Sequence, residues 1–118
     1  MADTPFQILV VEDNEDSREL LGEMLGVLGH DACCVPNAEA ALEAFGEKRF
    51  NILLADINLP GMTGLTLAEK LREGAPDLKI IFASGYGYLI ADRMDFPFIL
   101  LPKPYSLGQL QHALDAVI

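Results

Sequence analysis

The sequence predicts an α/β domain built on a doubly wound, five-stranded parallel sheet, and two features of its patterning support this. Five short apolar runs recur along the chain, each bounded by turn residues, as is typical of strands buried on both faces. Between the runs lie stretches whose apolar residues recur at helical spacing. Strands that alternate with helices form a three-layer sandwich, and right-handed crossovers between parallel strands favour a doubly wound sheet.

Three strands and two helices are predicted in the first half of the chain. The strands cover Ile8–Val11, the region around Ala32–Val35, and Asn51–Asp56. Asn14 and Asn37 precede the helices as candidate N-caps, because an asparagine oxygen can accept from free backbone N–H groups of the first turn. The residues expected to face the core are Leu20, Leu21, Met24, Leu25 and Leu28 in the first helix, which stops at Gly29, and Ala38, Ala41, Leu42 and Phe45 in the second.

Two longer helices are predicted in the second half. The first follows a turn over Pro60–Gly64 and is closed by Gly74 and Pro76. The second begins with a capping box, in which the side chains of Ser106 and Gln109 each accept from the other residue's backbone N–H. The inward residues are Leu67, Ala68 and Leu71 in the first helix and Leu107, Leu110, Leu114 and Val117 in the second, where Tyr105 and Leu110 are placed as a hydrophobic staple.

The last two predicted strands are Lys79–Ala83 and Phe98–Leu101. The stretch between them, Tyr86–Pro97, is the least regular part of the sequence and has room only for a short helix, around Leu89–Arg93.

Length and charge narrow the function classes. At 118 residues the chain is expected to be a single domain, 1–118, with residues 1–5 as a solvated tail. The formal net charge of −10 opposes direct binding to nucleic acid or to an anionic membrane and is compatible with a divalent-cation site. No apolar run approaches the ~20 residues needed to span a membrane, and no signal-peptide pattern opens the chain.

The adjacent cysteines Cys33 and Cys34 indicate a reducing compartment. Neighbours on a strand point to opposite faces, so this pair can neither cross-link the fold nor bind a metal together. We expect both to be buried small hydrophobes, and we expect the protein to be cytoplasmic.

Polar residues follow four of the five predicted strands. Glu12 and Asp13 follow the first, Asp56 ends the third, Ser84 follows the fourth and Lys103 follows the fifth. The carboxyl ends of parallel strands share one edge, so these side chains can converge. The carboxylates are suited to Mg²⁺, the lysine and hydroxyl to a phosphoryl group, and an Asp among them to nucleophilic attack on phosphorus. Each residue alone also fits a turn, a helix start or a solvated loop; their convergence favours a site.

Over Ile8–Val117 the chain resembles the response-regulator receiver domains of two-component signalling. The resemblance rests on four pieces in order, Val10–Asn14, Leu53–Gly61, Ala83–Gly85 and Lys103–Pro104. It implies a flavodoxin-like sheet of order 2-1-3-4-5 and a signalling module rather than an enzyme. It also implies Mg²⁺-dependent transfer of a phosphoryl group from a histidine kinase or phosphotransfer protein to Asp56, which switches binding to an unknown downstream protein.

The resemblance implies a role for each site residue. Asp56 would be the phosphoacceptor. The metal would be held by the acidic pair Glu12 and Asp13, with Asp13 as the direct ligand, by Asp56 and by the backbone carbonyl of Asn58. Ser84 would occupy the position of the switch hydroxyl, and Lys103 that of the family's lysine, with a cis Lys103–Pro104 bond.

Two departures concern how the signal is read out. Leu100 stands where receivers carry a Tyr or Phe, and the segment between Ser84 and Lys103 is short. The string Ile81–Gly87 resembles a subgroup marked by a Phe-Ala-Thr-Gly-type motif, which generally lacks that aromatic residue. We therefore expect Tyr86–Met94 to be the mobile element, with Tyr86 or Tyr88 reporting the phosphorylation state.

Two other functions remain open. An aspartate-nucleophile phosphohydrolase would need a second acid two residues after the nucleophile, where this sequence has Asn58. A degenerate receiver would bind partners without phosphorylation, although every chemical residue type is present here. We expect no output domain directly after Ile118, and hence either a stand-alone regulator or a receiver excised from a larger chain.

Overall fold

The protein is a five-stranded parallel sheet of order β2-β1-β3-β4-β5 with helices on both faces, which confirms the predicted fold class and strand order. The computed structural model describes residues 6–85 and 95–117. In this part of the chain the elements are β1 (Gln7–Val11), α1 (Glu15–Val27), β2 (Asp31–Val35), α2 (Ala38–Glu47), β3 (Ile52–Asp56), α3 (Gly64–Gly74), β4 (Lys79–Ser84), β5 (Ile99–Pro102) and α4 (Leu107–Val117). The predicted tail, the predicted helix around Leu89–Arg93 and the Tyr86–Met94 segment lie outside the described residues.

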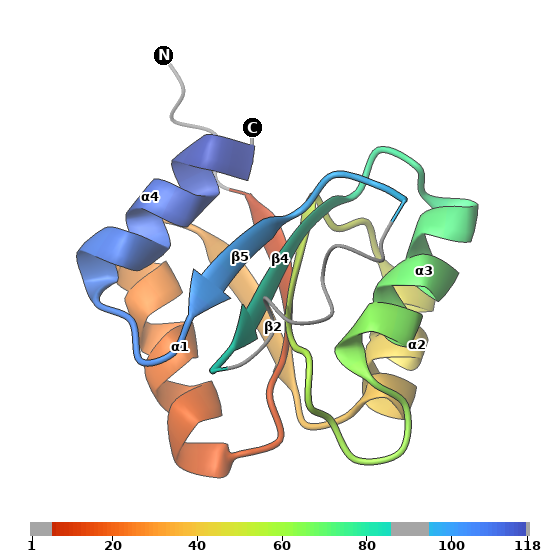
Figure 1. The fold of residues 1–118 in the computed structure, drawn as a ribbon, viewed down its shortest axis with the longest axis horizontal. Coiled ribbons are helices and arrows are strands. Elements are labelled where there is room, and N and C mark those ends of the chain that lie inside the picture. The colour runs from red at the N-terminus through yellow and green to blue at the C-terminus, as the bar shows by residue number, and fades with distance from the viewer. Residues whose placement is uncertain (1–5, 86–94, 118) are drawn as a thin grey trace.

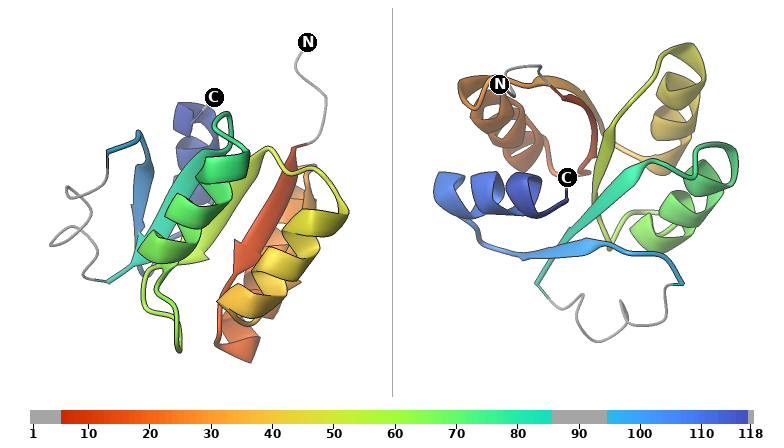
Figure 2. Two further views of the ribbon diagram at one scale, coloured as in Figure 1. Left: turned by 90° about the vertical axis from the view of Figure 1, so that its right-hand side faces the viewer. Right: turned by 90° about the horizontal axis from the view of Figure 1, so that it is seen from above.

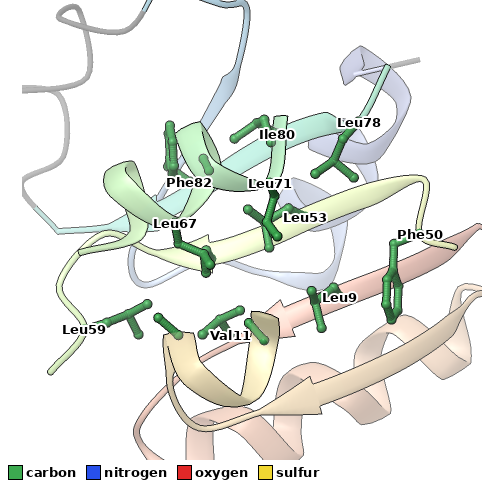
Figure 3. Packing of buried hydrophobic residues seen from close by; sticks show 14 of the residues in the cluster. Leu9, Val11, Phe50, Leu53, Leu59, Leu67, Leu71, Leu78, Ile80 and Phe82 are labelled. Atoms are coloured by element: carbon green, nitrogen blue, oxygen red, sulfur yellow. The ribbon is translucent and has the colours of Figure 1, made fainter. Parts of the chain in front are cut away.

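The sheet separates two hydrophobic cores. Helices α1 and α4 cover one face, and α2 and α3 cover the other (Figures 1 and 2). Alternation along β1 feeds both cores, because Ile8 and Val10 pack toward α1 and α4 whereas Leu9 and Val11 pack toward α2 and α3. Figure 3 shows the α2/α3 side, where Leu53 of β3 lies between the helices. Every residue of β3 is buried, as the uninterrupted apolar run predicts.

The predicted helix starts are confirmed by their hydrogen bonds. The Asn14 side chain accepts from the backbone N–H of Ser17 at 2.9 Å, and Asn37 caps α2 in the same way. In the capping box of α4, the backbone N–H of Ser106 donates to Gln109 at 2.8 Å and that of Gln109 donates to Ser106 at 3.1 Å. These bonds satisfy donors that the first helical turn leaves free.

The predicted apolar stripes were too broad. Leu20 is 57% exposed, Leu42 38% and Leu107 40%, although all three were expected to face inward. Consecutive helical residues point about 100° apart, and a helix lying on a sheet buries only the residues aimed at it. Leu21 and Ala41, the neighbours of Leu20 and Leu42, take the buried positions.

The cysteines lie on opposite faces of β2, as predicted, but they are half-buried rather than buried. The reason is that β2 is an edge strand with a neighbour on one side only. Burial and the adjacent Cys33 raise the pKa of the Cys34 thiol, and the positive charge of Arg18 lowers it by less. Cys34 therefore remains a protonated, small apolar group. No helix among the described residues is long and apolar enough to cross a membrane.

The contrast between Leu25 and Leu20 in α1 gives a direct test of this packing. Leu25 is fully buried, so Leu25→Ala should lower the free energy of unfolding by about 2–5 kcal/mol. Leu20→Ala, in the same helix, should change it by no more than about 0.5 kcal/mol. Urea unfolding of both variants measures the difference, and equal losses would show that Leu20 belongs to the core after all.

Candidate functional site

The carboxyl ends of four strands bring the predicted site residues together at one edge of the sheet, the end marked by the arrowheads in Figure 1. Asp56 is the last residue of β3 and Ser84 the last of β4, while Glu12 and Lys103 directly follow β1 and β5. The shared edge follows from the parallel pairing of these strands.

Lys103 joins two nearly buried carboxylates. Its Nζ lies 2.7 Å from Glu12 Oε1 and 2.7 Å from Asp56 Oδ2. Glu12 is 3% exposed and Asp56 8%, whereas the lysine side chain is 30% exposed. One ammonium therefore partners two acids that have largely lost their contact with water.

Each of these carboxylates has a second anchor in its own loop. Glu12 Oε2 accepts from the backbone N–H of Asn14 at 3.0 Å, and Asp56 Oδ1 accepts from that of Asn58 at 3.0 Å. Both side chains are thus held between a backbone donor two residues ahead and the shared lysine. Their orientation is set before any ligand binds.

The lysine is held in its charged form. Burial lowers the pKa of Lys103, but hydrogen bonds to Asp56 and Glu12, together with their charges, raise it by more, so its pKa lies above the ordinary lysine value. Burial also raises the pKa of the nearby Tyr105 phenol. The positive charge of Lys103 lowers this pKa, whereas the negative charges of Glu12 and Asp56 raise it further, and the net shift is upward. At neutral pH the site therefore contains an ammonium and a protonated phenol.

Glu12, Asp13 and Asp56 could together hold a metal ion, since each offers an oxygen within 4.8 Å of the others. Three carboxylates against one ammonium leave a formal charge of about −2, which a divalent cation would balance. Hard oxygen donors suit Mg²⁺, which takes one or two carboxylates directly. Asp13 is exposed, and its carboxylate has no hydrogen-bond partner among the described residues, so it is the most available of the three ligands.

Asn58 and Ser84 both lie next to Asp56. Asn58 is exposed, and its backbone contacts the Asp56 carboxylate through the N–H group described above. Ser84 is 3% exposed and follows Ala83, the residue paired with Asp56 across β3 and β4. Its backbone carbonyl accepts from the Lys103 N–H at 3.2 Å, which ties the ends of β4 and β5 together.

The sequence analysis missed Arg18, which supports the acidic loop from α1. Its Nη1 donates to the backbone carbonyl of Glu12 at 3.0 Å and lies 3.5 Å from that of Asp13. One signal was available: a basic residue near a helix N-terminus is unfavourable to the helix dipole, which suggests another role.

Gly64 was also missed, and it fixes the backbone behind Asp56. A Cβ on Gly64 would lie 2.3 Å from the Asp56 carbonyl oxygen, and the Gly64 N–H donates to Ile57 at 2.9 Å. Only glycine lets the start of α3 approach the end of β3 this closely.

A hollow of about 380 Å³ opens beside the lysine. Its lining combines Lys103, Pro104 and Tyr105 with α1, including the exposed Leu20. The predicted cis bond between Lys103 and Pro104 is confirmed at this edge.

A family model described as "Response regulator receiver domain" matches residues 8–115. The response regulator receiver protein CpdR of Brucella abortus is 33% identical over 115 residues, which cover 95% of this chain and 96% of that protein. The sensor kinase CckA of the same organism is 37% identical over 110 residues, which cover 87% of this chain but only 11% of the kinase. The chain thus matches nearly the full length of one relative and a small part of another.

Solved structures show the same similarity. The response regulator protein TrrA of Thermotoga maritima, in complex with Mg²⁺-BeF, aligns with a TM-score of 0.82 at 29% identity and covers 96% of this chain and 99% of that one. The chemotaxis response regulator CheY4 of Vibrio cholerae aligns with a TM-score of 0.88 at 21% identity, covering 98% of this chain and all of that one, and shares the fold.

Two glycine substitutions should have opposite effects on stability. Gly64→Ala places a methyl group against the Asp56 backbone and should destabilise the protein by about 1–3 kcal/mol. Gly26→Ala, in α1, meets nothing within 4 Å and should stabilise it by up to about 1 kcal/mol. Urea unfolding measures both, and stabilisation by Gly64→Ala would show that the close approach of α3 to Asp56 is absent.

Proposed function

Because this chain belongs to the response regulator receiver domain family, and so is a signalling module of two-component systems rather than an enzyme, we propose that Asp56 is its phosphoacceptor. The donor would be the phosphohistidine of a histidine kinase or phosphotransfer protein, in the cytoplasm. One observation carries the proposal: Asp56 lies at the sheet edge within 2.7 Å of a charged lysine and next to two further acids. A nucleophile, a phosphate-binding cation and a ligand set for a divalent metal are therefore adjacent.

In the proposed reaction, an oxygen of the Asp56 carboxylate attacks phosphorus. The new O–P bond forms as the N–P bond to histidine breaks, and the electron pair of that bond returns to the imidazole, which takes up a proton. The backbone N–H of Asn58 orients the carboxylate during attack. Lys103, already 2.7 Å from Asp56 Oδ2, needs little movement to donate to the incoming phosphoryl oxygens.

The acidic residues divide the remaining work. Asp13 and Asp56, with the backbone carbonyl of Asn58, would hold Mg²⁺, and Glu12 would add negative charge while remaining paired with Lys103. When bound, Mg²⁺ supplies positive charge that offsets the charge on the phosphoryl oxygens. Arg18 keeps the Glu12–Asp13 backbone in place through its bonds to the two carbonyls.

We also assign the chain to the receivers with a Phe-Ala-Thr-Gly-type motif, represented here by Phe82–Gly85. Leu100 pairs with Phe82 across β4 and β5 and packs against the α2/α3 core, so a rotating ring has no counterpart at this position. Ser84 and Lys103 would instead carry the signal by moving toward the new phosphoryl charge. The segment we expect to respond, Tyr86–Met94, lies outside the described residues, and it would bind the unidentified downstream protein.

Intact-mass measurement after incubation with acetyl phosphate and Mg²⁺ tests the phosphoacceptor. The wild type should gain one phosphate, and Asp56→Asn should gain none, because an amide cannot attack phosphorus. Asp77→Asn, an exposed aspartate outside the site, should label like the wild type. Equal labelling of Asp56→Asn would refute the assignment. No adduct on the wild type would favour the degenerate receiver, and continuous phosphate release without an adduct would favour the hydrolase.

Thermal unfolding with and without Mg²⁺ tests the metal ligands. A ligand at ten times its Kd adds about 1.4 kcal/mol, so the wild-type melting temperature should rise by several degrees. Asp13→Asn should lose most of this rise, whereas Asp16→Asn, an acid in the first turn of α1, should keep it. A full rise in Asp13→Asn would mean that other residues hold the ion.

A further inference from the structure

A second hollow, of about 610 Å³, lies at the opposite end of the sheet from Asp56. It is formed where the chain enters β1, β3 and β4, and its lining includes Phe6, the Lys48–Ile52 segment and the Gly74–Asp77 segment with Lys79. Figure 3 shows this separation, with Phe50 at one end of the α2/α3 core and Leu59, in the loop that follows Asp56, at the other. The proposed phosphorylation chemistry uses none of these residues.

The hollow is positively charged on a strongly negative chain. Three of the chain's eight Lys and Arg residues line it, Lys48, Arg49 and Lys79, against one acid, Asp77. All three cations are exposed, and among residues 6–85 and 95–117 none forms an ion pair, whereas Lys103 forms two. A local excess of positive charge on a chain of net charge −10 concentrates anions at this place.

The floor of the hollow is rigid. The Asn51 side-chain oxygen accepts from the backbone N–H of Gln7 at 2.7 Å. The Asn51 backbone N–H donates to the Gln7 carbonyl at 2.8 Å, and the Lys79 backbone N–H donates to the Asn51 carbonyl at 3.0 Å. Phe50 is 8% exposed and stacks on Phe45 with ring centroids 6.0 Å apart. The cations therefore extend from a fixed base, which lowers the entropic cost of binding.

These features favour carboxylates carried on a peptide. A nucleotide base would need an open aromatic face, but Phe50 is covered by Phe45 on one side and by the Lys48 ammonium, 5.3 Å from its ring centroid. The hollow lies by the C-terminal ends of α2 and α3, whose dipoles disfavour every anion, so the attraction for a ligand comes from the three cations. A long nucleic acid is repelled by the whole chain. The guanidinium of Arg49 can bind a carboxylate through two hydrogen bonds, and Phe45, Ala75 and Pro76 offer apolar contact beside it.

We propose that this basic hollow binds a short acidic segment of a partner protein, with carboxylates on Arg49, Lys48 and Lys79 and an apolar side chain against Phe45 and Pro76. Because the hollow lies at the far end of the sheet, the segment can stay bound while Asp56 exchanges its phosphoryl group. The partner is thereby held independently of the phosphorylation state.

Titration of the isotope-labelled chain with a synthetic peptide, Asp-Glu-Phe-Leu-Glu-Asp, followed by amide chemical shifts in NMR, tests this. Saturable shifts are expected at Phe50, Asn51 and Asp77, and the peptide Asn-Gln-Phe-Leu-Gln-Asn should bind at least tenfold more weakly. Raising the salt concentration should weaken binding as well, because the cations are exposed.

Matched charge reversals locate the site. Arg49→Glu should weaken peptide binding at least tenfold, while Lys70→Glu, an equal charge change on exposed α3 surface, should change it less than twofold. Asp56→Asn should bind like the wild type. Equal binding of the two peptides, equal effects of the two reversals, or shifts centred on Lys103 would overturn the proposal. The three cations would then serve only to offset the negative dipole ends of α2 and α3.

Discussion

The site depends on one ammonium that compensates two carboxylates removed from water. Burying Glu12 and Asp56 side by side is unfavourable for two reasons: each carboxylate loses hydration, and the two negative charges repel each other. Lys103 offsets these costs from a third strand, so the pair is stable only when β1, β3 and β5 are all in register. The three charged groups therefore come together only when the sheet is correctly assembled. The carboxylate of Asp13 forms no ion pair within the described chain, so the net negative charge that remains would favour a cation at this site.

The fold and the site could be predicted from sequence to the extent that local patterns determine them. The uninterrupted apolar run before Asp56 gave a buried central strand, and Asn14, Asn37 and Ser106 marked the helix starts, because these signals act within a few residues. Strand-end placement then sufficed to bring Glu12, Asp56 and Lys103 together. The failures concern tertiary detail: helical spacing alone could not tell Leu20 from Leu21, and nothing local shows that Gly64 touches the Asp56 carbonyl or that Arg18 reaches back to Glu12.

The parallel sheet also separates charge along its length. Acids gather where β1 and β3 end, whereas Lys48, Arg49 and Lys79 lie where β3 and β4 begin. Helix dipoles favour this arrangement, since basic groups are stabilised near the C-terminal ends of α2 and α3. A negative end suited to a metal and a positive end suited to carboxylates can therefore act on different partners, and the rigid β-sheet keeps them apart.

Because residue 100 is a leucine and not an aromatic residue, we expect a signal to leave the site through the backbone. The carbonyl of Ser84 accepts from the Lys103 N–H, so the ends of β4 and β5 are joined directly behind the two side chains expected to contact a phosphoryl group. Displacement of either side chain toward Asp56 acts on the same pair of strand ends. Leu100 pairs with the buried Phe82 and packs against the α2/α3 core, where close packing resists rearrangement. Displacement at the ends of β4 and β5 is thus favoured over movement inside the core. The structural change we expect on phosphorylation is therefore at the carboxyl ends of β4 and β5, next to Asp56.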